Sequence, residues 1–185
     1  MLTTRHISLI VFLAAFPVVG ILIWKLRPSP PRAVAMVLAG FYLAAVAGVV
    51  FGGIPIDPDL LEDLRSEAGG NWVPLRSLTP IMSFSGSNLL FKIGNLLLLA
   101  PLGVLLPVLS HRFRRLGSVV FLGLALSMTI ELTQLLGSTV LGYGYRVFQV
   151  EDIMLNTLGI VLGWAVWRGY RQLSSNPAGR SASPR

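Results

Sequence analysis

Six polar side chains interrupt three long apolar segments in the second half of the chain. They are Lys92, Asn95, Glu131, Gln134, Asp152 and Asn156. Polar residues at membrane depth are costly and usually face a bundle interior or a water-filled cavity. Carboxylates and amides together can orient a polar ligand by hydrogen bonding, and two carboxylates can also perform acid–base chemistry. We therefore treat this set as candidate ligand-binding residues.

The spacing of these residues places them on single helix faces. Lys92 and Asn95 are three residues apart, Ser127, Glu131 and Gln134 follow an i, i+4, i+7 pattern, and Asp152 and Asn156 are four apart. Each segment is therefore expected to carry one polar edge, as helices around a common interior would.

The composition is that of a membrane protein. Of the 185 residues, 54% are hydrophobic and only 12% are charged, and the mean hydropathy is +0.72. A soluble domain carries about 25% charged residues, so a soluble globular domain and a disordered chain are both excluded. The chain lacks cysteine, and His6 and His111 are too few for a histidine metal centre. We expect no metal and no cofactor.

Five segments are long and apolar enough to cross a bilayer, which takes about 20 residues. They are 7–26, 33–51, 88–109, 116–136 and 150–167. The predicted fold class is all-α, a polytopic membrane protein with a bundle of about five transmembrane helices. The predicted organisation is an N-terminal helix and basic loop (1–32), a transmembrane domain (33–170) and a disordered cytoplasmic tail (171–185).

Basic residues predict the orientation of these spans. Ten Lys and Arg residues flank the spans on one side, four lie in segments on the other, and Lys92 is just inside a span. The positive-inside rule then places the N-terminus outside and the C-terminus in the cytoplasm. In this orientation the six polar residues form one layer in the outer half of the bilayer, and the surplus positive charge does not call for a nucleic-acid partner.

The outer loop, residues 54–87, holds five of the eight acidic residues. Asp57 and Pro58 can begin a short helix, and Gly69 and Gly70 can end it. We expect a helix on the membrane surface, with a lid over a site as the alternative.

Several of the polar residues also have purely structural interpretations. Asn95 and Asn156 can link helices by hydrogen bonds, and Glu131 can pair with Lys92 or with Arg146 in the loop that follows. Glu151 is expected to be an exposed carboxylate at the interface.

Backbone features of the spans predict how the helices meet. Pro101 frees the carbonyl of Leu97 and predicts a kink. Gly159 and Gly163 form a small-xxx-small face that lets a neighbouring helix approach closely.

Four sequence elements resemble the VanZ-like membrane proteins. They are Asn71-Trp72-Val73-Pro74-Leu75, Asn95-x5-Pro101-x-Gly103, Glu131-x2-Gln134, and Arg146-x-Phe148-x3-Asp152-x3-Asn156-x2-Gly159. The resemblance covers about residues 71–164. It implies a bacterial plasma-membrane protein that acts in the cell envelope, because the family's namesake is associated with low-level resistance to the glycopeptide teicoplanin. It implies no catalytic mechanism.

The favoured hypothesis is an outward-facing polar pocket that binds an anionic lipid headgroup or a cell-wall-linked molecule, such as a lipid-linked precursor or a glycopeptide-related ligand. Arg146 and Lys92 would supply positive charge, and Glu131, Asp152, Asn95, Gln134 and Asn156 would orient the ligand. One alternative is a membrane enzyme in which Glu131 and Asp152 act as an acid–base pair or hold a divalent cation with Asn156. The other is a structural or assembly subunit whose polar layer only locks the helices together.

Overall fold

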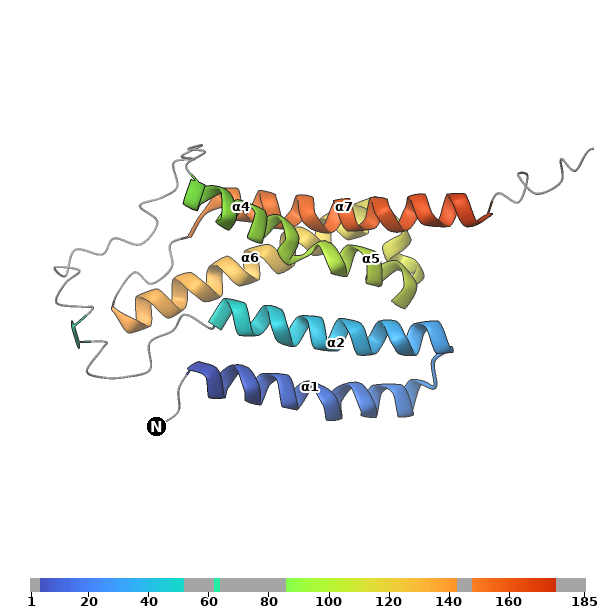
Figure 1. Cartoon of the computed structure of the whole chain (residues 1–185), viewed down its shortest axis with the longest axis horizontal. Helices are drawn as coiled ribbons and strands as arrows, with labels where there is room; N and C mark the ends of the chain where they lie inside the picture. The colour runs from blue at the N-terminus through green and yellow to red at the C-terminus, as the bar shows by residue number, and fades with distance from the viewer. Residues whose placement is uncertain (1–3, 52–61, 64–85, 143–147, 176–185) are drawn as a thin grey trace, which may run out of the picture.

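The computed structural model describes residues 4–51, 62–63, 86–142 and 148–175. These residues form an elongated all-α bundle, without a strand in the described ranges (Figure 1). Four stretches of helix are long and apolar enough to cross a membrane: Pro30–Val50, Leu89–Leu109, Leu116–Leu141 and Val150–Ser175. The predicted all-α membrane fold is confirmed.

The elements follow one another as antiparallel passes (Figure 1). Their bounds are α1 (Thr4–Leu26), α2 (Pro30–Phe51), α4 (Gly86–Leu98), α5 (Ala100–Leu109), the 3₁₀ turn η1 (His111–Arg114), α6 (Leu116–Leu141) and α7 (Val150–Ser175). Helices α4 and α5 run in the same direction and together make one pass.

Two helices end later than predicted. Helix α6 continues past residue 136 to Leu141, because a single glycine at Gly137 does not stop a helix. The helix ends only at Gly142, whose φ of 68° is the left-handed conformation that glycine adopts easily. Helix α7 continues to Ser175, so residues 171–175 are helical rather than part of a disordered tail.

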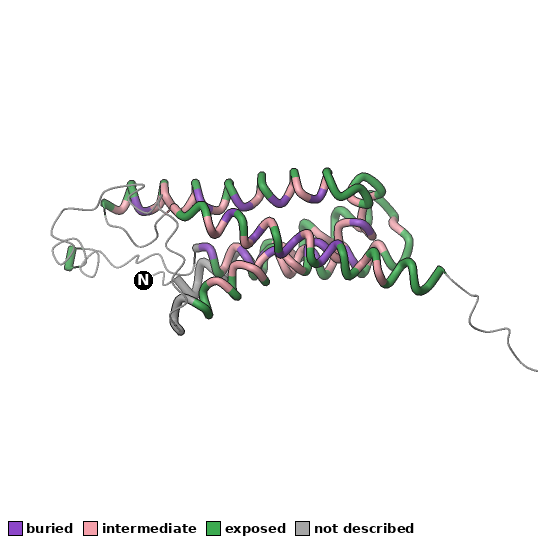
Figure 2. Tube along the Cα trace, turned by 90° about the horizontal axis from the view of Figure 1, so that it is seen from above, coloured by how far each residue is buried: buried purple, intermediate pink, exposed green. Residues whose placement is uncertain are grey.

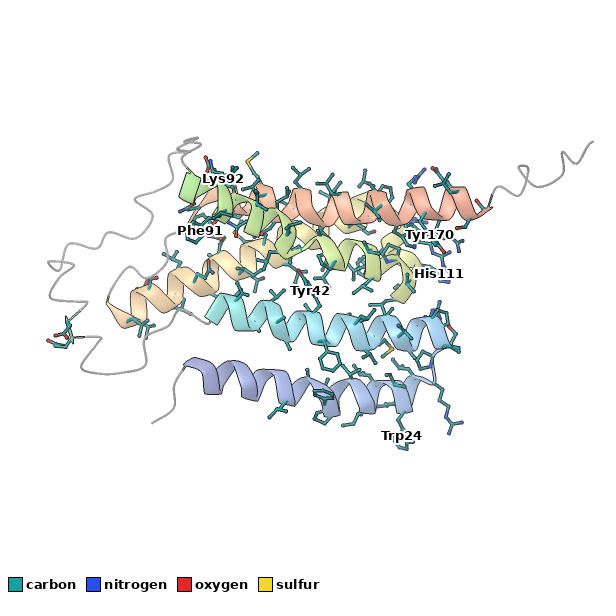
Figure 3. The ribbon with its side chains drawn as sticks, in the orientation of Figure 1. Trp24, Tyr42, Phe91, Lys92, His111 and Tyr170 are labelled. Atoms are coloured by element: carbon teal, nitrogen blue, oxygen red, sulfur yellow. The ribbon has the colours of Figure 1, made fainter. Side chains whose placement is uncertain are left out.

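The predicted kink in the third pass is a complete interruption at Leu99, between α4 and α5. Pro101 has no N–H to donate to the carbonyl of Leu97, so this turn loses a helical hydrogen bond. The hydroxyl of Tyr42, on α2, lies 3.3 Å from the Leu97 oxygen and also donates to the carbonyl of Leu98. Figure 3 shows Tyr42 between α2 and the α4–α5 pass.

Three glycines bring α7 against α4 and α5, and we call Gly103, Gly159 and Gly163 the glycine interface. A Cβ at Gly159 would overlap the carbonyl oxygen of Leu96, and one at Gly163 would overlap that of Ala100. A Cβ at Gly103 would overlap the carbonyl oxygen of Ile160. The predicted close approach at Gly159 and Gly163 is therefore confirmed, with backbone directly against backbone.

Beside the glycine interface lies a small apolar core. Its buried residues are Leu99, Leu102, Val119, Ile160 and Trp164, contributed by the α4–α5 pass, α6 and α7. Figure 2 shows that buried positions recur at intervals along the helices and alternate with exposed ones. Many exposed side chains are large and apolar, which suits helices surrounded by lipid.

Helix α1 is the outermost element and packs on α2 (Figure 1). The rings of Phe16 and Phe41 meet edge to face with centroids 4.6 Å apart. A Cβ at Gly40 of α2 would overlap the side chain of Val19. Helix α1 has 23 residues, and its part Leu13–Leu26 is apolar.

Several predictions fall outside the described residues. These are the outer loop 54–87 apart from Glu62, Asp63 and the start of α4, the residue Arg146, and the tail beyond residue 175. The surface helix and the lid therefore remain predictions.

Candidate functional site

Five of the predicted polar residues line one cavity of about 330 Å³, which we call the polar cavity. Its polar lining is Asn95 from α4, Glu131 and Gln134 from α6, and Asp152 and Asn156 from α7. Its apolar lining is Val49, Val50, Leu90, Phe91, Gly94, Leu98 and Ile130. The structure thus brings together polar edges that are separate in the sequence.

The polar cavity lies at one end of the bundle. Val50 belongs to the last turn of α2, Leu90 lies near the start of α4, and Asp152 is in the first turn of α7. Figure 3 shows Phe91 and Lys92 at this end, whereas Trp24, His111 and Tyr170 lie at the opposite end.

Basic residues gather at the end away from the polar cavity. The short connections and the last turns of α7 there carry Lys25, Arg27, Arg32, Arg112, Arg114, Arg115, Arg168 and Arg171. Arg32 on α2 donates to the His111 ring nitrogen of η1 at 3.2 Å. The polar cavity and this basic end thus lie at opposite ends of the bundle.

Glu131 is the most deeply buried acidic group in the described residues, with 2% of its surface exposed. Its carboxylate oxygen Oε2 accepts a hydrogen bond of 3.0 Å from the backbone N–H of Gln149. Gln149 immediately precedes α7, so this contact ties α6 to the start of α7. Glu131 therefore has a structural role, because it joins α6 to the start of α7, and it also forms part of the cavity wall.

Asn156 connects the same two helices one turn deeper. Its side-chain amide donates to the hydroxyl of Ser127 at 3.0 Å, and both residues are almost completely buried. Its carbonyl oxygen Oδ1 is also buried and has no hydrogen-bond partner among the described residues. Buried amide oxygens usually have a hydrogen-bond partner, either a protein group or an ordered water.

Lys92 does not line the polar cavity. Its ammonium lies 3.6 Å from the Glu151 carboxylate, and both side chains are about one-fifth exposed. Glu151 is therefore a partly buried ion-pair partner, and the expectation that it is an exposed carboxylate is wrong. The expectation failed because Lys92 and Glu151 lie far apart in sequence and meet only once α4 packs on α7. Arg146 lies outside the described residues.

Sequence reasoning missed the contribution of α2. Val49 and Val50 close one side of the cavity, and Tyr42 caps the carbonyls of Leu97 and Leu98, the latter a lining residue. A hydroxyl within an apolar span was the signal that could have identified Tyr42, because such a group needs a partner in the membrane. Nothing in the valines themselves indicated their position.

A protein-family model described as VanZ/LLP1 matches residues 39–171 of the chain. The chain belongs to the VanZ/LLP1 family. Comparisons with curated proteins and with solved structures gave no match. The family match and the apolar helices together identify a membrane protein.

The VanZ/LLP1 match contains every residue of the polar cavity and of the glycine interface. Helix α1 lies entirely before it. The candidate site therefore belongs to the family part of the chain, and α1 is packed onto that part from outside.

The chemistry open to the polar cavity follows from its lining. Two carboxylates and three amide side chains offer many hydrogen-bond acceptors and some amide donors. In the described part of the chain, no group of three or more His, Asp or Glu side chains is arranged to hold a metal ion. The arrangement suits recognition of a polar group at membrane depth, and it also places two carboxyl groups in the same cavity.

Proposed function

We propose that this VanZ/LLP1 protein binds the polar part of a membrane amphiphile, a lipid or a lipid-linked cell-envelope molecule, in the polar cavity. The observation that carries the proposal is the meeting of Asn95, Glu131, Gln134, Asp152 and Asn156 from three helices in one cavity. Polar residues at membrane depth face functional cavities far more often than lipid. Binding there would support envelope integrity or tolerance of a glycopeptide such as teicoplanin.

The cavity has a shape suited to an amphiphile. Leu90 and Phe91 are 73% and 66% exposed on the outside of α4, yet they also line the cavity. An apolar chain lying against these side chains in the bilayer can therefore keep its polar end among the amides and carboxylates.

Gly94 allows a direct test of occupancy. It lines the cavity, and a Cβ built on it would meet nothing within 4 Å. Gly94→Leu should therefore fill part of the cavity without disturbing the helices. The matched control is Gly117→Leu on α6, where a Cβ also meets open space at the opposite end of the bundle.

Both variants and the wild type would be purified in mild detergent, and the copurified lipids identified by mass spectrometry. We expect Gly94→Leu to lose at least about tenfold of a specific lipid, which corresponds to about 1.4 kcal/mol of binding free energy. Gly117→Leu should keep the wild-type lipids. Identical lipids in all three proteins would refute the proposal. Teicoplanin susceptibility of expressing cells gives the parallel physiological measurement.

The location proposed for the protein is the bacterial plasma membrane, with the N-terminus outside and the C-terminus in the cytoplasm. The support is the gathering of basic residues at one end of the bundle. A reporter fused after Arg185 should report the cytoplasm, and one inserted near Glu67 should report the outside. The reverse result at both positions would place the polar cavity in the inner leaflet.

An enzymatic function is the second candidate, because Glu131 and Asp152 line the same cavity. One carboxyl group could accept a proton while the other donates one to a bound lipid-linked substrate. If so, Glu131→Gln and Asp152→Asn would each abolish conversion of the lipid identified above while leaving its binding measurable. Recovery of that lipid unchanged after incubation with wild-type protein would count against catalysis.

A further inference from the structure

Among the described residues, the lining of the polar cavity is rich in hydrogen-bond acceptors and contains no basic side chain. Glu131 and Asp152 each offer carboxylate oxygens, and no basic residue is among the described residues that line the cavity. The nearby cation, Lys92, is held by Glu151 beside the cavity. The described walls thus favour a ligand group that donates hydrogen bonds and carries positive charge.

Neither carboxylate has to be unpaired to receive such a group. Glu131 already accepts a hydrogen bond from the Gln149 backbone through one oxygen. An ionised carboxylate has about four lone-pair directions, so it can keep its present partners and still accept a further donor. The described wall of the cavity therefore offers more hydrogen-bond acceptors than donors.

Asn156 provides an independent observation. It is 1% exposed, and its amide nitrogen is committed to Ser127, whereas its Oδ1 atom has no partner among the described residues. Burying an amide oxygen without a hydrogen bond costs free energy, so a donor placed at this atom would stabilise the site. The same side chain lines the cavity with the two carboxylates.

We propose that the polar cavity binds a primary ammonium group on a membrane amphiphile, held by Glu131, Asp152 and the Oδ1 atom of Asn156. A primary ammonium has three N–H donors, which matches three acceptors on two facing helices. The inference rests on the proposed function and narrows its ligand. Two sources carry this chemistry: the ethanolamine headgroup of a phospholipid and the free amine of an isoprenoid-linked peptide.

The test uses the full-length protein in nanodiscs or mild detergent with defined amphiphiles. Phosphatidylethanolamine has the primary ammonium, phosphatidylglycerol has the phosphate without nitrogen, and phosphatidylcholine has a quaternary ammonium without N–H donors. We expect binding of phosphatidylethanolamine to exceed that of the other two by at least about tenfold, as loss of one charge-assisted hydrogen bond would give. An isoprenoid-linked peptide with a free amine, compared with its N-acetylated form, distinguishes the second source.

The variants connect this preference to the cavity. Glu131→Gln and Asp152→Asn should each reduce the preference for the amine-bearing amphiphile by about tenfold or more. Glu151→Gln is the matched control, because Glu151 neighbours Asp152 in sequence but pairs with Lys92 outside the cavity lining. It should keep the wild-type preference.

The two proposals fail in different ways. Preferential binding of phosphatidylglycerol that Gly94→Leu abolishes would overturn the ammonium inference and leave the lipid-binding function standing. Binding of all amphiphiles that is equal in wild type and Gly94→Leu would overturn both. Loss of the amine preference in Glu151→Gln, but not in Asp152→Asn, would also refute the assignment of residues made here.

Discussion

Helix α7 meets its neighbours in two ways along its length. Between Gly159 and Trp164, its backbone lies directly against that of α4 and α5, through the glycine interface. One to two turns earlier, at Asp152 and Asn156, the same helices are spread around the polar cavity. The residue types at the two contacts explain why α7 packs closely at one and not at the other. Glycine has no side chain to separate the helices, whereas the side chains of Asp and Asn hold them apart.

A membrane bundle can contain a cavity at one end and remain stable when its helices pack closely elsewhere. Without a strong hydrophobic effect between helices, packing and hydrogen bonds must hold them together. Here, close packing is concentrated in the glycine interface and the adjacent core of Leu99, Ile160 and their neighbours. The end that carries the polar cavity can then keep polar groups around an open space, at a cost in packing.

The largest effect is expected at the glycine interface. Gly163→Ala places a methyl group on the carbonyl oxygen of Ala100, and a backbone atom cannot rotate away as a side chain can. The helices must move apart, which should cost about 3 kcal/mol, the upper part of the range for overpacking. Thermal unfolding in detergent measures the loss.

Gly169→Ala is the control for this prediction. It lies on the same helix, but a Cβ there meets nothing within 4 Å. Alanine has the higher helix propensity, so the change should be neutral or slightly stabilising. Equal destabilisation by both variants would mean that the backbone contact does not hold the bundle together.

The second-largest effect on stability is expected at Glu131. It distinguishes a residue that lines a wet cavity from one that only holds the helices together. Glu131→Leu removes the acceptor for the Gln149 N–H, so it should destabilise the protein by about 2 kcal/mol. Glu131→Gln keeps an acceptor oxygen and should change stability by less than about 1 kcal/mol, because water or ligand can meet the amide in a polar cavity.

Thermal unfolding of both Glu131 variants, beside the lipid measurement, tests this contrast. If Glu131→Gln is as unstable as Glu131→Leu, then the charge neutralises a dry buried partner. The polar end would then be a structural lock like the glycine interface, and the ligand site should be abandoned.

How much the sequence predicts differs between these two regions. The glycine interface could be predicted, since Gly159 and Gly163 are four apart on one helix and their effect depends only on their own missing side chains. Periodicity could also assign Ser127, Glu131 and Asn156 to the polar edges of their own helices. The family resemblance depended in part on Glu131, Asn156 and Gly159, and the family match bears it out.

Other features depend on how helices far apart in the sequence pack together. Periodicity places Lys92 and Glu151 on helices without indicating that they face one another, and it does not indicate that Val49 and Val50 close the cavity. Helix ends were also misplaced, because Gly137 lies within α6 and only the left-handed Gly142 ends it. A local pattern cannot tell which of two nearby glycines adopts that conformation.

A smaller effect is expected at Leu99, where the two regions meet. Tyr42→Phe leaves the carbonyls of Leu97 and Leu98 without the hydroxyl of α2. The loss should be about 1 kcal/mol, because hydrogen bonds between membrane helices contribute modestly. Tyr170→Phe, at an exposed position, should change the melting temperature little. Equal melting temperatures for wild type and Tyr42→Phe would show that the break is held by the glycine interface alone.

The smallest effect is expected for the ion pair between Lys92 and Glu151, which lies beside the cavity and not in its lining. The Lys92–Glu151 pair is partly exposed, and ion pairs of this kind contribute about 0.2–1 kcal/mol. A double-mutant cycle with Lys92→Gln and Glu151→Gln, measured by thermal unfolding in detergent, should give a coupling energy of about 0.5 kcal/mol. A second cycle pairs Lys92→Gln with Glu131→Gln and should give a coupling energy near zero. If the larger coupling joins Lys92 to Glu131 instead, then Lys92 neutralises the interior carboxylate. The ion pair beside the cavity and the carboxylate inside it would then belong to one charge network rather than to two separate parts of the bundle.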